Sequence, residues 1–449
     1  MSEELRTAVE RLFPGVRADL ESLVRIPSVS ADPDRATDLR VCAERVRDLL
    51  ADVGLDVEVL DVPDSPPAVI ATRRPAPGAP TVLLYAHYDV QPTGDLDGWT
   101  TAPFEPTERL GRLHGRGASD DKSGIAIHLG SLRALAALGA PTDIGITVLV
   151  EGEEELGSPH AAALLDSYGD RLVADAFVIA DSEHWAVGRP ALTTSLRGLV
   201  DAAVEVRTLE VGVHSGQFGG AVPDAITALS RLIATLHDER GNCAIAGLVE
   251  APAPDVDLDE DELRRSAGVI DGVEVVGDAS ITSRLWMRPA VSVLALDAPR
   301  LSEAINQIVP VARAKVSLRL APGDDPGRAM QALVRHLEGN APWGARVTVT
   351  PGSSAPPFAL AERGPIFQAF AAGMAEAWGT AAAEIGIGGS IPLVAMLAER
   401  FPLAAILITG VGDPTSRIHG PDESQDLGEL QRSILAEALA LRALADAAR

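Results

Sequence analysis

Residues 81–89 read TVLLYAHYD, and this stretch decides the class of fold. Its first six residues are nearly all apolar, as expected of a strand that is buried on both faces of a parallel sheet. His87 and Asp89 stand at its carboxyl end. In open α/β sheets, functional groups gather at the carboxyl ends of the strands. The stretch therefore predicts an α/β fold and the edge of the sheet that carries the chemistry.

Predicted helices and further buried strands lie on both sides of this stretch. Apolar residues recur at helical spacing in residues 1–25, 39–53 and 122–138. The predicted strands are residues 57–61, 68–72, 81–86, 144–151, 176–181 and 402–409. Strands that alternate with helices indicate an α/β domain with a mixed, parallel-rich sheet flanked by helices.

A different pattern begins near residue 196. Residues 199–207 alternate in polarity like a half-exposed strand, and a strand–helix–strand–strand–helix–strand order runs to residue 350. This order predicts a small α+β domain whose antiparallel sheet is exposed on one face. Residues 402–409 again have the apolar sequence of a buried strand. We therefore expect residues 196–355 to be inserted between two parts of the first domain, residues 1–195 and 356–449.

Length and composition limit the class of protein. The 449 residues are too many for one ordinary core, and the formal net charge of −26 disfavours binding to nucleic acid or anionic membranes. Solubility is the simpler reason for this charge, although it also suits cations. Cys42 and Cys243 form no metal-binding spacing and favour a reducing compartment. Without an apolar signal core or a stretch of about 18 apolar residues, we expect a soluble, cytoplasmic protein.

His87 follows a predicted strand, and acidic residues follow other predicted elements of the chain in the same way. A glycine-rich turn carries Asp120 and Asp121 at the start of a helix, one strand runs into EGEEE (151–155), and another ends at Asp181. Alone, the first pair is typical of a helix cap, and a histidine near an aspartate is typical of a solvated surface. Together they place several like charges at the ends of buried strands, which is costly unless a cation balances them.

The residue types indicate which cation. His419 follows the strand at 402–409 and adds a second imidazole. Two histidines and three carboxylates without a thiolate suit zinc, cobalt or manganese. They suffice for two metal ions that share a bridging carboxylate, an arrangement that activates water for hydrolysis. The residues alone leave the roles of Glu153, Glu154 and Glu155 open.

Seven motifs, in this order, resemble the M20 metallopeptidase family and, within it, the carnosinase-type dipeptidases. They are YAHYDVQP (85–92), GRGASDDKSG (115–124), EGEEELGS (151–158), a strand ending at Asp181, GVHSGQFGG (212–220), GGSIP (388–392) and RIHGPDE (417–423). The resemblance implies a zinc-exopeptidase-like fold that binds two Zn²⁺ per subunit, with Co²⁺ or Mn²⁺ as possible substitutes. It also implies a cis peptide bond between Asp120 and Asp121.

Carried over position by position, the resemblance implies a role for each residue of the metal cluster. One zinc would be bound by His87 and Asp181, the other by Glu155 and His419, and both by Asp120. Asp89 would orient His87. Glu154 would be the general base that takes a proton from the water between the metals and later gives it to the leaving amine.

The inserted domain resembles the lid and dimerisation domain of the family. His214 matches a histidine that reaches the partner subunit's site and stabilises the developing oxyanion. Judged alone, a histidine in a glycine-rich loop is typical of a turn, and one arginine on a strand is typical of a surface charge. Gln307 departs from the Thr or Asn of many family members. The positions that match substrate contacts are Arg319, Gln307, Gly389 and Ser390.

Three functions are open. The first is hydrolysis of the amide bond of dipeptides or similar small peptides by a homodimer joined through the inserted domain. The second is an N-acyl amino acid amidohydrolase of the same family, a deacetylase or desuccinylase, although residues 240–290 and RIHGPDE favour the dipeptidase. The third is a non-catalytic metal-binding or interaction protein on this fold. The intact ligand set and Glu154 argue against the third.

Overall fold

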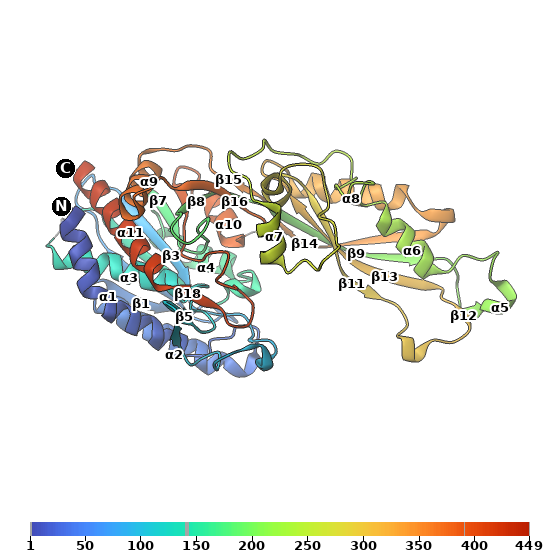
Figure 1. Ribbon diagram of the computed structural model, residues 1–449, viewed down its shortest axis with the longest axis horizontal. Coiled ribbons are helices and arrows are strands. Elements are labelled where there is room, and N and C mark those ends of the chain that lie inside the picture. Colours follow the sequence, from blue (N-terminus) through green and yellow to red (C-terminus); the bar gives the residue numbers. More distant parts are fainter. Residues whose placement is uncertain (1, 140–142, 390, 449) are drawn as a thin grey trace. The chain divides into compact units, whose positions relative to one another are not determined.

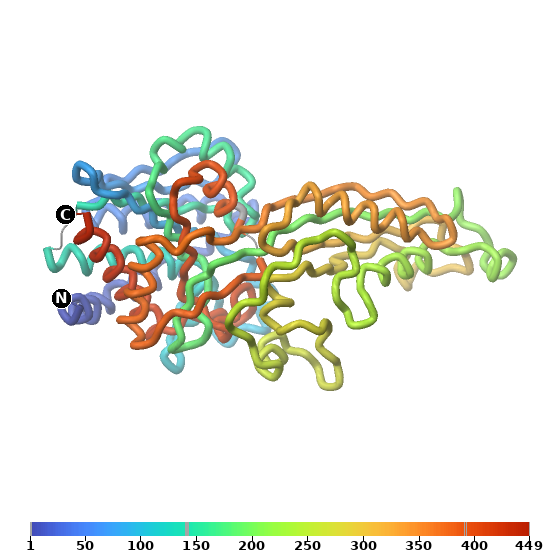
Figure 2. Tube along the Cα trace, turned by 90° about the horizontal axis from the view of Figure 1, so that it is seen from above, coloured from blue at the N-terminus to red at the C-terminus, as the bar shows by residue number. Residues whose placement is uncertain are grey.

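The computed structural model describes residues 2–139, 143–389 and 391–448, and the chain forms two compact units (Figure 1). The first unit comprises Met1–Thr194, Leu360–Ile385 and Ile391–Arg449, and the second comprises Ser195–Ala359 and Gly386–Ser390. Figure 2 shows the blue and red ends of the chain in the first unit, whereas the second is green to orange. The chain therefore leaves the first unit after Thr194, returns to it at Leu360, and leaves it a second time for the short segment Gly386–Ser390.

A nine-stranded sheet runs through the first unit. The strand pairs at its centre are parallel and those toward its edges are antiparallel, which confirms the predicted mixed, parallel-rich α/β fold. The central strands are almost wholly buried, as their apolar sequences predict. In order across the sheet, the strands are β1 (Asp56–Leu60), β2 (Ala68–Arg73), β6 (Gly145–Glu151), β3 (Thr81–His87), β7 (Ala176–Ile179), β17 (Ala405–Ile408), β8 (Ala191–Leu196) with β16 (Ala383–Ile387) beside it, and β15 (Phe358–Ala359).

Helices flank this sheet, and their aliphatic faces share one hydrophobic core with its strands. Among the described residues no helix is both long and apolar enough to cross a membrane. A separate three-stranded sheet, β18 (Ser424–Asp426), β5 (Arg112–His114) and β4 (Thr107–Arg109), flanks the glycine-rich loop. The helices of this unit are α1 (Ser2–Val24), α2 (Ala36–Ala51), α3 (Lys122–Ala137), α4 (Ala161–Tyr168), α9 (Pro365–Trp378), α10 (Pro392–Arg400) and α11 (Leu427–Ala447).

The second unit is built on a four-stranded antiparallel sheet. Alternate residues of its strands pack against α6 (Ala225–Ala234) and α8 (Pro326–Gly339) in a second hydrophobic core, while the opposite face carries charged side chains. The strands, in order, are β11 (Ala290–Asp297), β13 (Val311–Leu320), β9 (Gly198–Arg207) and β14 (Arg346–Ala355). Smaller elements are β10 (Val213–His214), α5 (Ser215–Phe218), α7 (Glu260–Ala267) and β12 (Gln307–Ile308).

Candidate functional site

Parallel strands of the first unit deliver polar side chains to one edge of the sheet. β3 ends at His87, β7 is followed by Asp181, and β6 leads into a short 3-10 helix, Glu154–Leu156. The carboxyl ends of parallel strands meet at the same edge. The glycine-rich loop before α3 brings Asp120 to this edge, and the loop after β17 brings His419.

Asp120 lies between two imidazoles. Its Oδ1 is 3.1 Å from His87 Nε2, and its Oδ2 is 3.0 Å from His419 Nε2. Asp181 Oδ1 is 4.0 Å from His87 Nε2, and Glu155 Oε2 is 3.2 Å from His419 Nε2. Within each group of three, the potential ligand atoms all lie within 4.8 Å of one another. The structure thus brings the five candidate ligands into two groups that share Asp120.

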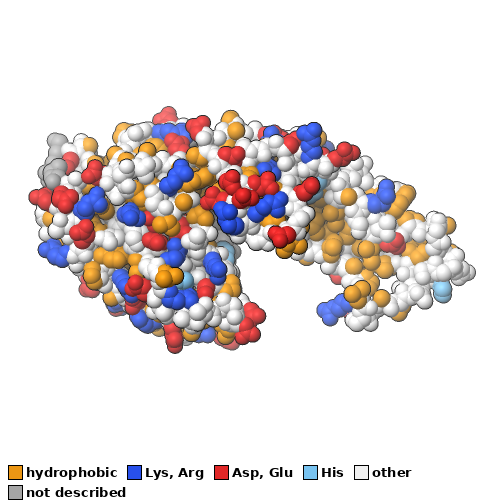
Figure 3. All heavy atoms as spheres, viewed as in Figure 1, with side chains coloured by type: hydrophobic (Ala, Val, Ile, Leu, Met, Phe, Trp, Pro, Cys, Tyr) orange, Lys and Arg blue, Asp and Glu red, His pale blue; other side chains and the backbone are white. Residues whose placement is uncertain are grey.

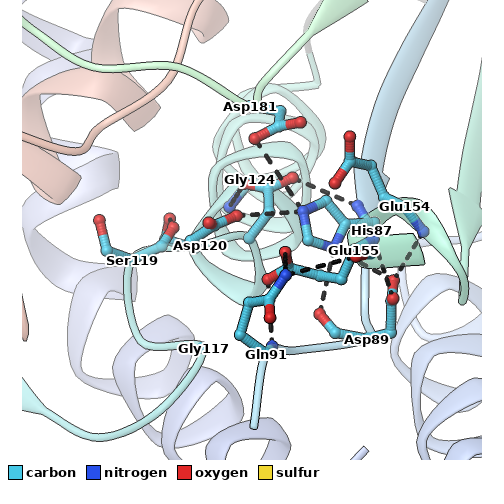
Figure 4. Close-up of polar contacts among 12 residues, drawn as sticks. His87, Asp89, Gln91, Gly117, Ser119, Asp120, Gly124, Glu154, Glu155 and Asp181 are labelled. Carbon is cyan, nitrogen blue, oxygen red and sulfur yellow. Dashed lines mark hydrogen bonds and ion pairs between the residues drawn. The ribbon is translucent and has the colours of Figure 1, made fainter. Parts of the chain in front are cut away.

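Asp89 connects His87 with the turn that carries the glutamates. The Nδ1 atom of His87 is 3.1 Å from the Asp89 carbonyl oxygen and 3.3 Å from Asp89 Oδ1. The Asp89 carboxylate accepts hydrogen bonds from the backbone N–H groups of Glu154 and Glu155, each 3.1 Å long. Because Nδ1 faces Asp89, Nε2 is the nitrogen that faces Asp120 (Figure 4).

Two of the three consecutive glutamates are held by different partners. Glu155 accepts hydrogen bonds from the backbone N–H of Gln91 (3.1 Å) and from its side-chain Nε2 (2.8 Å). Glu153 Oε1 accepts a hydrogen bond from the backbone N–H of His160 (2.8 Å), and its Oε2 is 2.9 Å from His160 Nδ1. Sequence reasoning did not single out Gln91 as a functional residue, although it lies in the motif YAHYDVQP.

Glu154 is the third of these glutamates, and its carboxylate accepts no hydrogen bond from any residue in the described ranges. In the view of Figure 4 it lies on the same side of His87 as the carboxylate of Asp181. Burial and the negative charge of Asp181 hold the pKa of Glu154 well above its usual range. Burial also raises the pKa of Asp181 to about 7, and the neighbouring Asp120 and Glu155 add to this effect.

These pKa values show an excess of negative charge that a cation would offset. Hydrogen bonds to Asp120 and Glu155 raise the pKa of His419 to about 10, so these carboxylates strongly attract positive charge. The donor set of two imidazoles and three carboxylates, without a thiolate, suits zinc, cobalt or manganese. With one oxygen of Asp120 directed to each group, the residues fit two metal ions.

The residue after Asp120 links the glycine-rich loop to β3. The peptide bond between Asp120 and Asp121 is cis, as the resemblance implies. Asp121 Oδ2 accepts a hydrogen bond from the backbone N–H of His87, and its Oδ1 accepts one from Gly124 at the start of α3, each 3.2 Å long. Asp121 therefore caps the helix and fixes the loop against the end of β3.

A buried ion pair holds the same loop from the other side. Glu423 is fully buried, and its carboxylate is 2.7 Å from Arg116 Nη1. Arg116 Nη2 donates to the carbonyl oxygens of Pro92 (3.1 Å) and His419 (3.2 Å). Glu423 also accepts hydrogen bonds of 3.0–3.1 Å from three backbone N–H groups of the loop, those of Gly117, Ser119 and Asp120. Glu423 stands in RIHGPDE, but nothing in that motif predicts this contact.

The remaining sequence-predicted site residues belong to the second unit. His214 and Gln307 face each other as paired residues of β10 and β12. His214 is exposed, and its Nδ1 accepts a hydrogen bond from the backbone N–H of Gly216 (3.0 Å). Arg319 lies on β13, Gly389 follows β16, and Ser390 lies outside the described residues.

The sequence is similar to known dipeptidases over most of its length. The cysteinylglycine-S-conjugate dipeptidase of Corynebacterium striatum is 37% identical over 434 residues, which cover 96% of this chain and 94% of that protein. The Beta-Ala-His dipeptidase of Rattus norvegicus is 28% identical over 349 residues, which cover 74% of this chain and 70% of that protein.

Solved structures share the fold. Human carnosine dipeptidase 1 has a TM-score of 0.81 at 25% identity, and the dipeptidase Dug1p of Saccharomyces cerevisiae has a TM-score of 0.82 at 22% identity. In each comparison 99% of both chains is covered. The family model for peptidase family M20/M25/M40 matches residues 83–443. With this match and a relative of 37% identity, the chain belongs to peptidase family M20/M25/M40.

Proposed function

We propose that this protein is a dipeptidase that works with two metal ions. The observation that carries the proposal is Asp120, whose two oxygens face two different imidazoles. His87 and Asp181 would hold one ion, Glu155 and His419 the other, and Asp120 both. When bound, such a pair of ions polarises a carbonyl and lowers the pKa of water to about 7. Zinc is the proposed metal, and cobalt or manganese would substitute for it.

Glu154 is the proposed general base. Its carboxylate faces the cluster and has no hydrogen-bond donor among the described residues, and burial together with Asp181 raises its pKa well above the usual range. A carboxylate in this state accepts a proton from water more readily than an ordinary one and then passes it to the leaving amine. Asp89 supports this role by fixing the backbone of Glu154.

The proposed substrates are dipeptides or similar small peptides, and the proposed compartment is the cytoplasm. The names of the relatives support dipeptides as substrates, because they describe dipeptidases that act on cysteinylglycine conjugates and on Beta-Ala-His. The two free cysteines, Cys42 and Cys243, are consistent with a reducing compartment.

A homodimer joined through the second unit is the proposed assembly, with His214 serving the partner's site. The edge strand β11 supports the proposed dimer, because two of its leucine side chains are exposed: Leu294 is 62% exposed and Leu296 is 65% exposed. Figure 3 shows hydrophobic side chains gathered on the visible face of this unit. Exposed apolar side chains on an edge strand are typical of a surface that pairs with another chain.

A substrate panel tests the proposed function against its alternatives. Zinc-loaded protein is assayed with dipeptides, including Cys-Gly and β-Ala-His, and with N-acetyl and N-succinyl amino acids. We expect kcat/KM for the best dipeptide to exceed that for the best acylated amino acid by at least about tenfold, or ~1.4 kcal/mol. The reverse order would favour an amidohydrolase. Hydrolysis of neither class by protein that holds two metal ions would favour a non-catalytic role.

A further inference from the structure

The two histidines of the metal cluster are held in different ways. His87 is buried, and its Nδ1 faces Asp89 while its Nε2 faces Asp120. The side chain of His419 is 55% exposed, and its Nε2 faces Asp120 and Glu155. Among the described residues, the Nδ1 of His419 has no hydrogen-bond partner. The position of this ring therefore depends on the loop that carries it.

That loop, residues 416–424, has a backbone that needs support. Its non-glycine residues in the left-handed region are Arg417 (φ 55°), His419 (φ 63°) and Asp422 (φ 60°). Residues other than glycine rarely adopt this conformation, and it persists where the surrounding structure holds it. Contacts with the rest of the unit must therefore keep His419 at the cluster.

Arg112 joins the two ends of this loop. The ends meet where the backbone N–H of Ser424 donates to the carbonyl oxygen of Ser416 (2.9 Å). Arg112 Nε donates to the hydroxyl oxygen of Ser424 (2.9 Å), and its Nη2 donates to the carbonyl oxygen of the same residue (3.0 Å). Nη2 also donates to the hydroxyl oxygen of Ser416 (3.1 Å) and is 2.9 Å from Asp413 Oδ2. One guanidinium thus closes the base of the loop.

These contacts are largely withdrawn from water. Asp413 and Ser416 are buried, and only 15% of the Arg112 side chain is exposed. Asp413 Oδ1 also accepts a hydrogen bond from the backbone N–H of Thr415 (2.8 Å). Buried polar groups that are satisfied by hydrogen bonds rigidify their surroundings. We therefore expect the base of the loop to be rigid as long as Arg112 is present.

The strand that carries Arg112 is itself held on both sides. Arg112 lies on β5, opposite Asp426 of β18 and Arg109 of β4. Arg109 Nη2 is 3.1 Å from Asp422 Oδ1, which also accepts a hydrogen bond from the backbone N–H of Thr100 (2.8 Å). The hairpin of β4 and β5 therefore supports the loop twice, at its base through Arg112 and at Asp422 through Arg109.

We propose that Arg112 is a positioning residue for the second metal ion, because it holds the loop that presents His419 to Glu155. Its hydrogen bonds and ion pairs reach none of the proposed ligands, and it lies outside the sequence motifs of the site. Loss of Arg112 would free the base of the loop and displace His419, but it would leave the group around His87 in place. The inference rests on the proposed function for the two ions.

Metal-binding titrations test this role without an assay of hydrolysis. Metal-free protein is titrated with zinc against a chelator of known affinity, which gives a dissociation constant for each ion. Arg112→Met should raise one of the two constants about 10- to 100-fold, the usual effect of residues that orient ligands, and leave the other nearly unchanged. Arg112→Lys keeps the charge but not the planar set of N–H groups, so its effect should be smaller.

A double variant identifies the ion that is affected. His419→Ala removes a ligand of the second group, so adding Arg112→Met to it should weaken zinc binding no further. Arg133→Met is the matched control, because Arg133 is a partly buried arginine of the same unit and is 2.6 Å from Asp19. It should keep both dissociation constants. Unchanged constants in Arg112→Met, equal increases in both, or a further loss in the double variant would overturn the inference.

Hydrogen exchange of the metal-free protein separates this inference from the proposed function. In Arg112→Met the backbone amides of residues 413–424 should exchange faster than in wild type, and those of α3 should keep their rates. Arg112→Lys should show the same pattern to a smaller extent. Unchanged exchange in residues 413–424, or equally faster exchange in α3 in both variants, would contradict the role of Arg112. Wild-type protein that binds fewer than two zinc ions would instead contradict the proposed function, and the exchange rates would still decide whether Arg112 holds the loop.

Discussion

Three consecutive glutamates differ in their surroundings, because each carboxylate has different neighbours. Glu153 is held by His160, and Glu155 is held by Gln91 beside His419. Glu154 is left facing His87 and Asp181 (Figure 4). Since the side chains are chemically identical, only their packing separates them, and that packing fits a base at position 154 and a ligand at position 155.

Glu154→Gln should keep both metal ions and lose turnover. A general base contributes about 100- to 10,000-fold to the rate, and an amide cannot accept the proton. The measurement is kcat on a dipeptide alongside metal content by elemental analysis. Glu153→Gln is the matched control and should retain most activity, because Glu153 pairs with His160. Glu155→Gln should lower metal content instead. Loss of metal in Glu154→Gln but not in Glu155→Gln would reverse the assignment.

His184 should make the first unit less stable in mild acid. Burial lowers the pKa of His184 to about 4, and its Nδ1 accepts a hydrogen bond from the backbone N–H of Ala191 (3.2 Å). In the unfolded chain the pKa is about 6.5, so the unfolded state binds more protons between these values. The contribution of His184 to stability is therefore present above pH 6.5 and is lost as the pH falls toward 4.

Urea unfolding of wild type and His184→Gln at pH 7 and pH 4.5 measures this contribution. Between these pH values the wild type should lose about 2 kcal/mol more unfolding free energy than the variant, as the linkage relation gives for a pKa of about 4 against 6.5. Equal losses in both proteins would show that His184 is not buried in its neutral form.

At the scale of elements, the loop before α3 is held in place by a residue near the other end of the chain. Glu423 accepts hydrogen bonds from three backbone N–H groups of this loop, including that of Asp120, and pairs with Arg116. Glu423→Gln should weaken metal binding about 10- to 100-fold, the usual effect of residues that orient ligands. The measurement is a competition titration of metal-free protein with a chelator of known affinity.

Glu437→Gln is the control for Glu423→Gln. Glu437 is a second buried acid, and it contacts His128 and Ser131 rather than the glycine-rich loop. Both variants should lower stability, because each disturbs a buried acid. Only Glu423→Gln should weaken metal binding. Equal metal affinity in the two variants would show that the loop keeps its conformation without Glu423.

The sequence predicts those elements whose local pattern matches their surroundings. β3, β6 and β7 are buried on both faces, so their apolar runs and the polar residues after them predict the edge of the sheet correctly. The cis bond at Asp120 follows from the family resemblance. The fold class and the family are confirmed, and with them a metallopeptidase of the dipeptidase type.

The contacts that hold the site depend on residues far apart in the chain. Gln91 reaches Glu155 across 64 positions, and Glu423 reaches Asp120 across 303. No periodicity or spacing carries such information, so both residues were missed. β8 was missed as well, because ALTTSL mixes apolar and hydroxyl side chains and lacks the uniform character of the central strands.

At the scale of the whole molecule, the roles of the second unit, its predicted boundaries and the dimer stay predictions. His214→Ala should lower turnover about 100- to 1000-fold while leaving metal content intact, as loss of an oxyanion donor does. Mixing it with Glu154→Gln tests action in the partner's site. Freely exchanged subunits should recover about a quarter of wild-type activity per site, by binomial counting on a two-fold dimer. No recovery despite demonstrated exchange would place His214 outside the partner's site.

Metal reconstitution on a dipeptide tests the central claim most directly. Protein is stripped with a chelator, verified as metal-free, and titrated with zinc while hydrolysis of Cys-Gly or β-Ala-His and bound metal are measured together. Because Asp120 faces both groups of ligands, we expect no activity without metal and full activity near two ions per subunit. Cobalt or manganese should also restore activity. Full hydrolysis by verified metal-free protein would contradict the account.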